Sequence, residues 1–336
     1  MLNNLFIILI IQLFVLFLLN KVSYKIDFLD YPNKRKVHST PTPFIGGLAL
    51  GLSYCVVVFI ADINFLYLNF IFAYALIVSI FGLVDDKFNI SPTSKIILQS
   101  IPVCILISKG LYLTNIGDYE IIGKINLGGY GEIFTFFCCL LIMNAFNYSD
   151  GIDGLLSTLF INIFINFLII CYVFNEIYIG QILIYFIFPV LIFLLFNFSL
   201  LKLPKIFLGD SGSTLLGFLT GFVMIFLYEK VSIKPSILIW PVALIIYEFI
   251  STNLVRIFKK KKIFQSGNDH IHYQISKKYN LKVLGINLTM NLVNCIITFS
   301  GLLIYYLFGS LFSLIGFIIF FFIYLRIKFS FFINVF

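Results

Sequence analysis

The chain alternates long apolar runs with short polar segments, and this alternation predicts its fold. Each run has about the length, roughly 20 residues, that a helix needs to cross the hydrocarbon of a bilayer. The runs are continuous and do not alternate residue by residue, which excludes a transmembrane β-barrel. We therefore expect a single domain, 1–336, that is an all-α polytopic membrane protein of about 11 (10–11) transmembrane helices. The predicted spans are residues 2–20, 44–61, 65–84, 94–113, 132–148, 155–174, 180–201, 207–228, 235–256, 284–307 and 310–326.

The first apolar run and the longest outer loop add detail to this prediction. The first run carries no basic segment before it and no small-residue cleavage site after it, so we expect it to remain as a helix. The longest outer loop, 114–131, contains the apolar segments Tyr119–Ile122 and Ile125–Leu127 around Gly123-Lys124. This pattern predicts a small external hairpin with a glycine-first turn.

Composition and charge support a membrane protein and set its orientation. Hydrophobic residues make up 61% of the chain and charged residues 11%, whereas globular proteins carry roughly a quarter charged residues. With the N-terminus outside, 19 of the 23 Lys and Arg residues lie on the inner side, as the positive-inside rule predicts. The net charge of +8 is then a topology signal. The lipid bilayer is the expected partner, and the sequence shows no basic stripe typical of nucleic-acid binding.

The same orientation places the polar, non-helical segments on one face. These segments are residues 27–47, 85–95, 147–154, 204–213 and 263–280. The outer loops are short or carry few polar side chains. A working site is therefore expected to face the cytosol.

The most informative stretch is Asn144–Leu155, which lies between two apolar runs. Its four polar side chains are spaced three residues apart: Asn144, Asn147, Asp150 and Asp153. Polar groups at the edge of lipid are costly and usually indicate a ligand, a cavity or a partner. Gly151 and Gly154 allow the chain to leave helical geometry, so that all four groups could converge on one object. The alternative is a capped helix end followed by a turn.

Two further groups of acids lie on the same face. The adjacent carboxylates of Asp85 and Asp86 repel each other, and a divalent cation with oxygen ligands, Mg²⁺ or Mn²⁺, relieves this repulsion. The alternative is a helix end whose acids stay hydrated. Asp210 begins the predicted span 207–228, where an acid is a helix cap by default. It becomes a candidate ligand because it shares this face with the other acids.

Basic residues in the first inner segment are candidate phosphate ligands. Arg35 and Lys36 can clamp phosphate oxygens, and His38 follows them closely. The alternative is an anchor to anionic lipid.

Further candidates for binding phosphate lie later in the chain. Lys95 ends the segment that contains the paired acids. His270 and His272 are too few for a zinc site, because no Cys or third His accompanies them. Like Lys95, the pair can donate hydrogen bonds to a diphosphate or a sugar.

Together these motifs resemble the polyprenyl-phosphate N-acetylhexosamine-1-phosphate transferases, which include the MraY and WecA types. The matching pieces occur in family order and are Asp30–His38 with Gly46-Gly47, Asp85-Asp86, Asn144–Leu155, Phe207–Ser213 and His270-Ile271-His272. The His-Ile-His piece is similar to the WecA branch, since the MraY branch shows three consecutive histidines.

The resemblance implies an enzyme that moves a sugar-1-phosphate, expected to be HexNAc-1-phosphate, from a UDP-sugar onto undecaprenyl phosphate and releases UMP. It implies Mg²⁺ or Mn²⁺ as cofactor, and a place in the bacterial inner (cytoplasmic) membrane at the start of cell-envelope polysaccharide synthesis. A homodimer is left open. The implied catalytic residues are Asp85, Asp86, Asp150 and Asp153. The implied metal ligands are Asp210, Asp85, Asp86 and Asn147. The expected substrate-binding residues are Arg35, Lys36, His38, Lys95, Asn144, Asn147, His270 and His272.

Two positions depart from the family pattern. Tyr273 stands where WecA-type sequences continue with a further histidine. The family also tends to carry an asparagine three residues before the proline matched by Pro204, and the nearest candidate here is Asn197. The alternative functions are an intramembrane prenyltransferase, which would want aspartate-rich repeats on two loops, and a secondary transporter, which would show an internal repeat and charges at the bilayer midplane.

Overall fold

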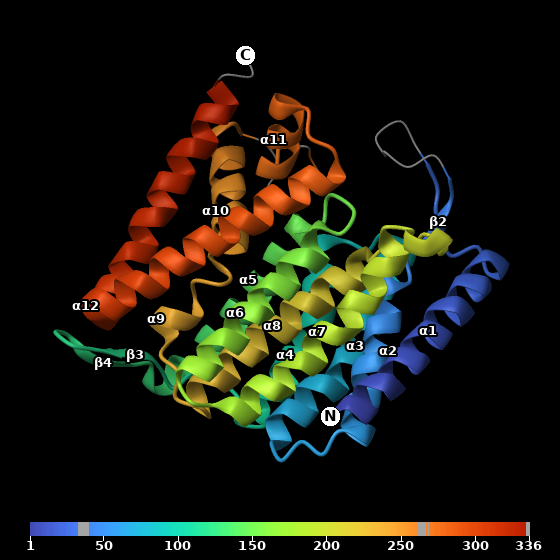
Figure 1. The fold of residues 1–336 in the computed structure, drawn as a ribbon. Helices are drawn as coiled ribbons and strands as arrows, with labels where there is room; N and C mark the ends of the chain where they lie inside the picture. The colour runs from blue at the N-terminus through green and yellow to red at the C-terminus, as the bar shows by residue number, and fades with distance from the viewer. Residues whose placement is uncertain (33–39, 261–266, 268, 334–336) are drawn as a thin grey trace.

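The computed structural model describes residues 1–32, 40–260, 267 and 269–333 (Figure 1). Its helices are α1 (Leu2–Lys25), α2 (Gly46–Ile60), α3 (Leu66–Phe88), α4 (Pro92–Ser108), α5 (Gly131–Ser149), α6 (Leu155–Val173), α7 (Ile177–Asn197), α8 (Gly209–Glu229), α9 (Pro235–Leu238), α10 (Ala243–Phe258), α11 (Ile271–Tyr279) and α12 (Val283–Ile333). Among the described residues, seven helical segments are long and apolar enough to cross a membrane, and α2 and α4 are shorter apolar helices. The predicted multi-pass, mainly helical membrane protein is confirmed, while the count of eleven spans stays a prediction.

Three predicted boundaries differ from the structure, and a fourth agrees with it. Helix α3 runs on to Phe88, so the paired acids lie on its last turn and not in a loop. The predicted span 235–256 is divided into α9 and α10 around Pro241, which has no N–H to continue a helix. The last two predicted spans are confirmed as the two arms of α12, which are separated by a break at Gly309 with φ 88° and ψ −173°. Helix α11 occupies a segment that we expected to be non-helical.

The predicted hairpin is present, but its turn lies elsewhere. Strands β3 (Asn115–Tyr119) and β4 (Gly123–Asn126) are antiparallel and pair Tyr119 with Gly123. The turn therefore spans residues 120–122 and precedes the expected Gly123-Lys124. The Glu120 carboxylate accepts hydrogen bonds from the N–H groups of Ser310 and Leu311, at 2.8 and 3.1 Å. This contact holds Glu120 in the turn and caps the second arm of α12.

Helix α8 lies at the centre of the bundle and packs against α2, α3 and α5. Glycines allow the close approach on two sides. A Cβ added to Gly47 would lie 2.0 Å from the backbone nitrogen of Gly212, and one added to Gly82 would lie 2.3 Å from the Cα of Ser211. Any side chain at either position would force the backbones apart. These contacts bring the last turn of α3 onto the first turn of α8.

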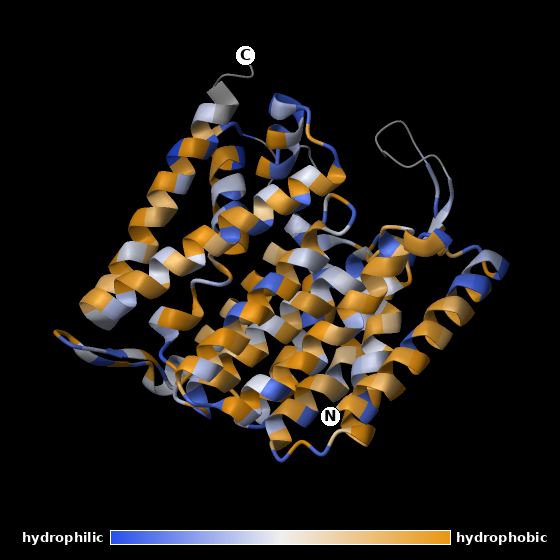
Figure 2. Ribbon diagram, viewed as in Figure 1, coloured by the Kyte–Doolittle hydropathy of each residue, from blue (hydrophilic) through white to orange (hydrophobic). Residues whose placement is uncertain are grey.

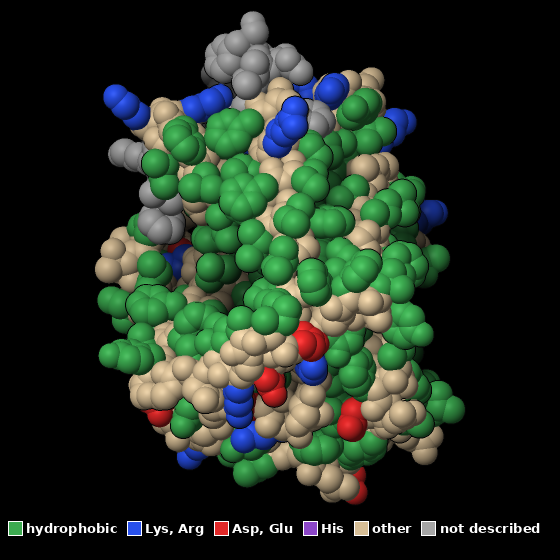
Figure 3. All heavy atoms as spheres, turned by 90° about the vertical axis from the view of Figure 1, so that its left-hand side faces the viewer, with side chains coloured by type: hydrophobic (Ala, Val, Ile, Leu, Met, Phe, Trp, Pro, Cys, Tyr) green, Lys and Arg blue, Asp and Glu red, His purple; other side chains and the backbone are tan. Residues whose placement is uncertain are grey.

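The helices are built mainly of hydrophobic residues (Figure 2). Figure 3 shows a broad band of hydrophobic side chains across the middle of one face, with Lys and Arg side chains gathered near its upper edge. On the first arm of α12, exposed apolar residues recur at helical spacing: Leu284, Leu288, Leu292, Ile296, Phe299 and Leu303. Such a continuous apolar surface is stable in lipid and not in water.

The polar segments gather at one end of the bundle, as the sequence predicts. Helix α11, strand β2 (Thr42–Pro43) and the C-terminal end of α12 lie at this end, while the N-terminus and the β3–β4 hairpin lie at the other (Figure 1). Strand β2 pairs with β1 (Leu29–Asp30). Arg35, Lys36 and His38 lie outside the described residues.

Candidate functional site

Asp86 caps the N-terminus of α8. Its two carboxylate oxygens accept hydrogen bonds from the N–H groups of Asp210 and Ser211, at 2.8 and 3.0 Å. Gly209 has φ +75°, and a Cβ there would lie 2.7 Å from an Asp86 oxygen. A glycine is thus required for the turn and for the approach, and the anion is favoured by the helix dipole. The capping interpretation proposed for Asp210 applies instead to Asp86.

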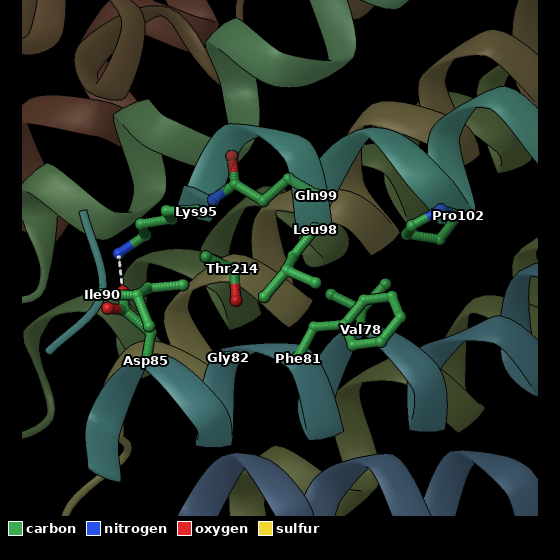
Figure 4. A pocket seen from close by; sticks show the side chains of 10 residues that line it. All are labelled: Val78, Phe81, Gly82, Asp85, Ile90, Lys95, Leu98, Gln99, Pro102 and Thr214. Carbon is green, nitrogen blue, oxygen red and sulfur yellow. Dashed lines mark ion pairs between the residues drawn. The ribbon is translucent and has the colours of Figure 1, made fainter. Parts of the chain in front are cut away.

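Lys95 joins the acids of two helices. Its ammonium lies 2.8 Å from Asp85 and 2.6 Å from Asp210, and it donates to the amide oxygen of Asn147 at 3.3 Å. Lys95 stands on the first turn of α4, which Ser91 begins by accepting a hydrogen bond from the N–H of Ser94. Figure 4 shows Lys95 extending from α4 toward Asp85 on α3. Residues from α3, α4, α5 and α8 thus meet at one ammonium group.

Asn147 orients Asp210 within this cluster. Its amide nitrogen donates to Asp210 and to the Ser213 hydroxyl, both at 2.8 Å. Asn144 lies one turn deeper and donates to Gln99 at 3.0 Å and to its own helix. The two asparagines therefore do not serve the same group.

A narrow cleft leads away from Asp85 and Lys95 between α3 and α4 (Figure 4). Its lining includes five apolar side chains: Val78, Phe81, Ile90, Leu98 and Pro102. Gln99 and Thr214 are its other polar side chains. Gln99 was not expected from the sequence, although a lone amide in an apolar run signals a polar role.

The oxygens around Lys95 fit a divalent cation. The Asp85 and Asp210 carboxylates and the Asn147 amide oxygen all approach one positive charge, and hard oxygen ligands are what Mg²⁺ and Mn²⁺ prefer. Asp86 is engaged by backbone N–H groups instead. Within the described ranges, no three Asp, Glu, His or Cys side chains form a cluster suited to a metal ion. A site here would therefore need the amide oxygen or oxygens from a substrate.

The four polar groups of the 144–153 stretch diverge, contrary to the expected convergence. Asp153 forms an ion pair at 2.6 Å with Lys205, which lies in the segment 198–208 before α8. Asp150 follows the end of α5, and its pKa is raised to about 8. Withdrawal of the carboxyl group from water is the main cause, and the nearby charges of Asp210 and Asp153 add to it. Once α5 ends, the three-residue spacing no longer keeps the side chains on one face.

The histidine segment packs directly against this loop. The rings of His270 and His272 stack with centroids 5.4 Å apart, and both side chains are buried. The Tyr273 hydroxyl donates to the Gly151 carbonyl at 2.6 Å. A Cβ on Gly151 would lie 2.5 Å from Nε2 of His272. The residue that departs from the family pattern thus anchors the loop that carries Asp150.

His272 is a neutral side chain in this environment. Burial, reinforced by the neighbouring His270, lowers its pKa to about 3. Its Nε2 atom has no hydrogen-bond partner among the described residues. A buried nitrogen without a partner is uncommon, and this one lies next to Gly151.

Several other residues organise this end of the molecule. Arg256 makes two hydrogen bonds to the Asp269 carboxylate, at 2.7 and 2.6 Å, and so ties the start of α11 to the end of α10. Asn197 donates to the carbonyl of Ile206 at 2.9 Å and closes the segment before α8. Lys328, one of the 19 basic residues counted on the inner side, is fully buried against Glu248.

Comparison with known proteins agrees with the motifs. Residues 65–228 match the model of glycosyl transferase family 4. The undecaprenyl-phosphate α-N-acetylglucosaminyl 1-phosphate transferase of Yersinia pestis is 29% identical over 266 residues, covering 78% of this chain and 73% of the relative. That of Escherichia coli K12 is 28% identical, with coverages of 78% and 72%. A probable undecaprenyl-phosphate N-acetylglucosaminyl 1-phosphate transferase of Bacillus subtilis is 26% identical, with coverages of 77% and 72%. These matches confirm the resemblance of the chain to the polyprenyl-phosphate N-acetylhexosamine-1-phosphate transferases.

Proposed function

We propose that the protein transfers HexNAc-1-phosphate from a UDP-sugar to undecaprenyl phosphate and releases UMP. The convergence of Asp85, Asp210, Asn147 and Lys95 beside an apolar cleft is the observation that carries this proposal. It combines ligands for an anionic reacting group with a surface for a hydrocarbon chain. The names of the relatives supply the acceptor and the sugar-1-phosphate class.

The chemistry needs positioning more than a strong base. A lipid phosphate already carries an anionic oxygen that can attack the donor's phosphorus, so catalysis rests on orientation and on neutralising charge. Lys95 supplies a positive charge beside Asp85 and Asp210. The cleft encloses only about 10 Å³, so we propose that it widens to place the first isoprene units of the acceptor against its apolar side chains, such as Phe81 and Leu98.

Asp85, Asp210 and Asn147 are the residues proposed to hold Mg²⁺ or Mn²⁺. A bound divalent ion would offset the negative charge of the donor diphosphate. In this arrangement Asp86 acts through the helix that it caps, keeping Asp210 at the cluster. The roles of Asp150 and Asp153 as catalytic groups remain part of the proposal.

The donor is proposed to lie between the cluster and α11. His270, His272 and the loop 150–154 are proposed to line this side of the site, which is supported by the packing of His272 and Tyr273 against Gly151. Arg35, Lys36 and His38 are proposed to contact the donor phosphates. Asn144 is proposed to act through Gln99, which lines the cleft.

We further propose that this end faces the cytosol in the inner membrane of a bacterium. The excess of Lys and Arg on the inner segments supports this orientation. The bacterial relatives support the compartment. A homodimer and a single domain are kept as proposals.

The proposal is tested by incubating purified protein with undecaprenyl phosphate, Mg²⁺ and a panel of UDP-sugars. We expect a lipid-linked sugar diphosphate and an equal amount of UMP with at least one UDP-HexNAc. Release of pyrophosphate instead would indicate a prenyltransferase. Uptake of substrate into proteoliposomes without bond formation would indicate a transporter.

A further inference from the structure

The C-terminal helices hold a buried charged network that the proposed chemistry does not use. Its centre is the carboxylate of Glu248 on α10, which is 3% exposed. Its donors are His270 Nδ1 at 3.1 Å, the N–H of Ile271 at 3.1 Å, the Thr252 hydroxyl at 3.0 Å, the Tyr324 hydroxyl at 2.6 Å and the Lys328 ammonium at 2.7 Å. Five donors from α10, α11 and α12 thus surround one anion.

Helix association alone is a weak explanation for this network. Withdrawing an ion pair from water offsets most of its attraction, and apolar side chains of similar volume often stabilise a protein as well or better. Buried ionisable residues in membrane proteins are rare and usually have a functional role. A role for the Glu248 carboxylate in orienting its neighbours explains the network better than stabilisation alone.

One oxygen of Glu248 fixes both the ring of His270 and the start of α11. Oε1 accepts from His270 Nδ1 and from the N–H of Ile271, the first residue of that helix. An ionised carboxylate only accepts hydrogen bonds, so the proton of His270 must reside on Nδ1. The Lys328 ammonium balances the charge of the carboxylate and contacts the same oxygen, Oε1, at 2.7 Å.

The orientation of the His270 ring affects the loop 150–154 of the candidate site through packed side chains. The His270 ring stacks on His272, and the edge of Tyr148 meets it at a centroid distance of 5.6 Å. Nε2 of His272 in turn faces Gly151. A shift of the His270 ring would therefore reach the loop through packed side chains.

We propose that Glu248 and Lys328 form a positioning pair. It holds His270 in the Nδ1–H tautomer and sets α11 against the loop 150–154, so that the histidines are preorganised for the UDP-sugar. This inference rests on the proposed function for its ligand. The tautomer and its dependence on Glu248 stand independently of that ligand.

Two matched double variants separate positioning from packing. Glu248→Met with Lys328→Met removes the pair and leaves no unbalanced charge. Glu248→Gln with Lys328→Met also removes both charges but keeps an acceptor oxygen for Nδ1. Thr298→Val, which removes a buried hydrogen bond from α12 to the Trp240 carbonyl, is the control.

The first readout is ¹⁵N magnetic resonance of histidine-labelled protein in nanodiscs. The chain has only three histidines, and His270→Gln assigns the signal. We expect the Nδ1–H tautomer in the wild type, in the control and in the Gln variant, and its loss in the Met variant. An Nε2–H tautomer in the wild type, or an unchanged signal in the Met variant, would overturn the proposal.

The second readout is the affinity for the donor side of the site, probed with UMP and UDP-N-acetylglucosamine. We expect the Met variant to bind at least tenfold more weakly than the wild type, while the Gln variant and the control stay within threefold. Equal binding by the two double variants would contradict the positioning role. Absence of binding and turnover in the wild type would count against the proposed function, and the tautomer measurement would still decide whether Glu248 orients His270.

Discussion

The Lys95 ammonium lies 2.6 Å from the Asp210 carboxylate and links the first turn of α4 to the first turn of α8. It also pairs with Asp85, so one cation serves acids from two other helices. A divalent ion at the same oxygens would have to displace or share this ammonium, because two positive groups so close together repel each other. Competition between the Lys95 ammonium and a divalent ion for these oxygens can therefore be measured as a change in metal affinity.

Removing the Lys95 charge should strengthen metal binding and impair transfer. We expect Lys95→Met to bind Mn²⁺ at least threefold more tightly in electron paramagnetic resonance titrations and to lose more than tenfold in turnover. Lys109→Met, an exposed change just after the same helix, is the control. Unchanged Mn²⁺ affinity in Lys95→Met would show that the ammonium and the metal do not share ligands.

The capping role of Asp86 predicts a difference between two substitutions. Asp86→Ala leaves the first N–H groups of α8 without their acceptor, which costs about 1–2 kcal/mol for a helix cap. Asp86→Asn keeps one acceptor oxygen and should lose less stability. In thermal unfolding in detergent, we expect the midpoint temperature to decrease from the wild type to Asp86→Asn and further to Asp86→Ala. Identical midpoints for Asn and Ala would argue against the cap.

The contact between Tyr273 and Gly151 predicts graded losses of activity. Tyr273→Phe removes one hydrogen bond, worth about 0.5–1.5 kcal/mol, and should lower turnover by roughly two- to tenfold. Gly151→Ala should be more damaging, because its Cβ would press on His272 and on the Tyr273 hydroxyl. Gly129→Ala is the matched control, since nothing lies within 4 Å of the added Cβ. Wild-type turnover in Gly151→Ala would refute the anchoring of the loop.

The buried, neutral His272 predicts a pH-dependent stability. Its folded pKa of about 3 lies below the ordinary value of 6.5, so the unfolded chain binds its proton first as the pH falls. The stability associated with His272 is complete above about pH 6.5 and is lost progressively toward pH 3. Asp150, with its raised pKa, has the opposite slope over part of this range. The measurement is therefore a difference: the advantage of the wild type over His272→Gln in thermal midpoint should shrink between pH 7.5 and 5. A constant difference would contradict the neutral state.

The sequence predicted the helical fold and the gathering of polar segments because both follow from hydropathy and charge. The apolar runs give the helices, and the Lys and Arg asymmetry orders the loops. The hairpin was also predicted, although its turn precedes the expected one. Glu120 in this turn contacts α12, a long-range interaction that no local pattern reveals. Helix α11 was missed because it is short and polar, and its apolar contacts are made with distant segments.

The sequence predicted many residues of the candidate site, but it did not predict which of them form hydrogen bonds and ion pairs with one another. Asp85, Asn147 and Asp210 meet as their motifs implied, but only the structure shows that Lys95 joins them. Asp153 was expected beside them, yet it pairs with Lys205 after the chain turns. Glu248 was passed over as part of an apolar run, although a single acid in such a run was a signal in itself.

The reverse reaction tests the transferase assignment most directly. If a lipid phosphate displaces UMP from a UDP-sugar, one phosphoanhydride replaces another and little free energy separates the two sides. Incubating the lipid-reconstituted protein with undecaprenyl-diphosphate-sugar, Mg²⁺ and radiolabelled UMP should then yield labelled UDP-sugar, and Asp85→Asn or Asp210→Asn should suppress the label by more than tenfold. Absence of labelled UDP-sugar across several HexNAc lipids, from protein shown to be folded, would contradict the account.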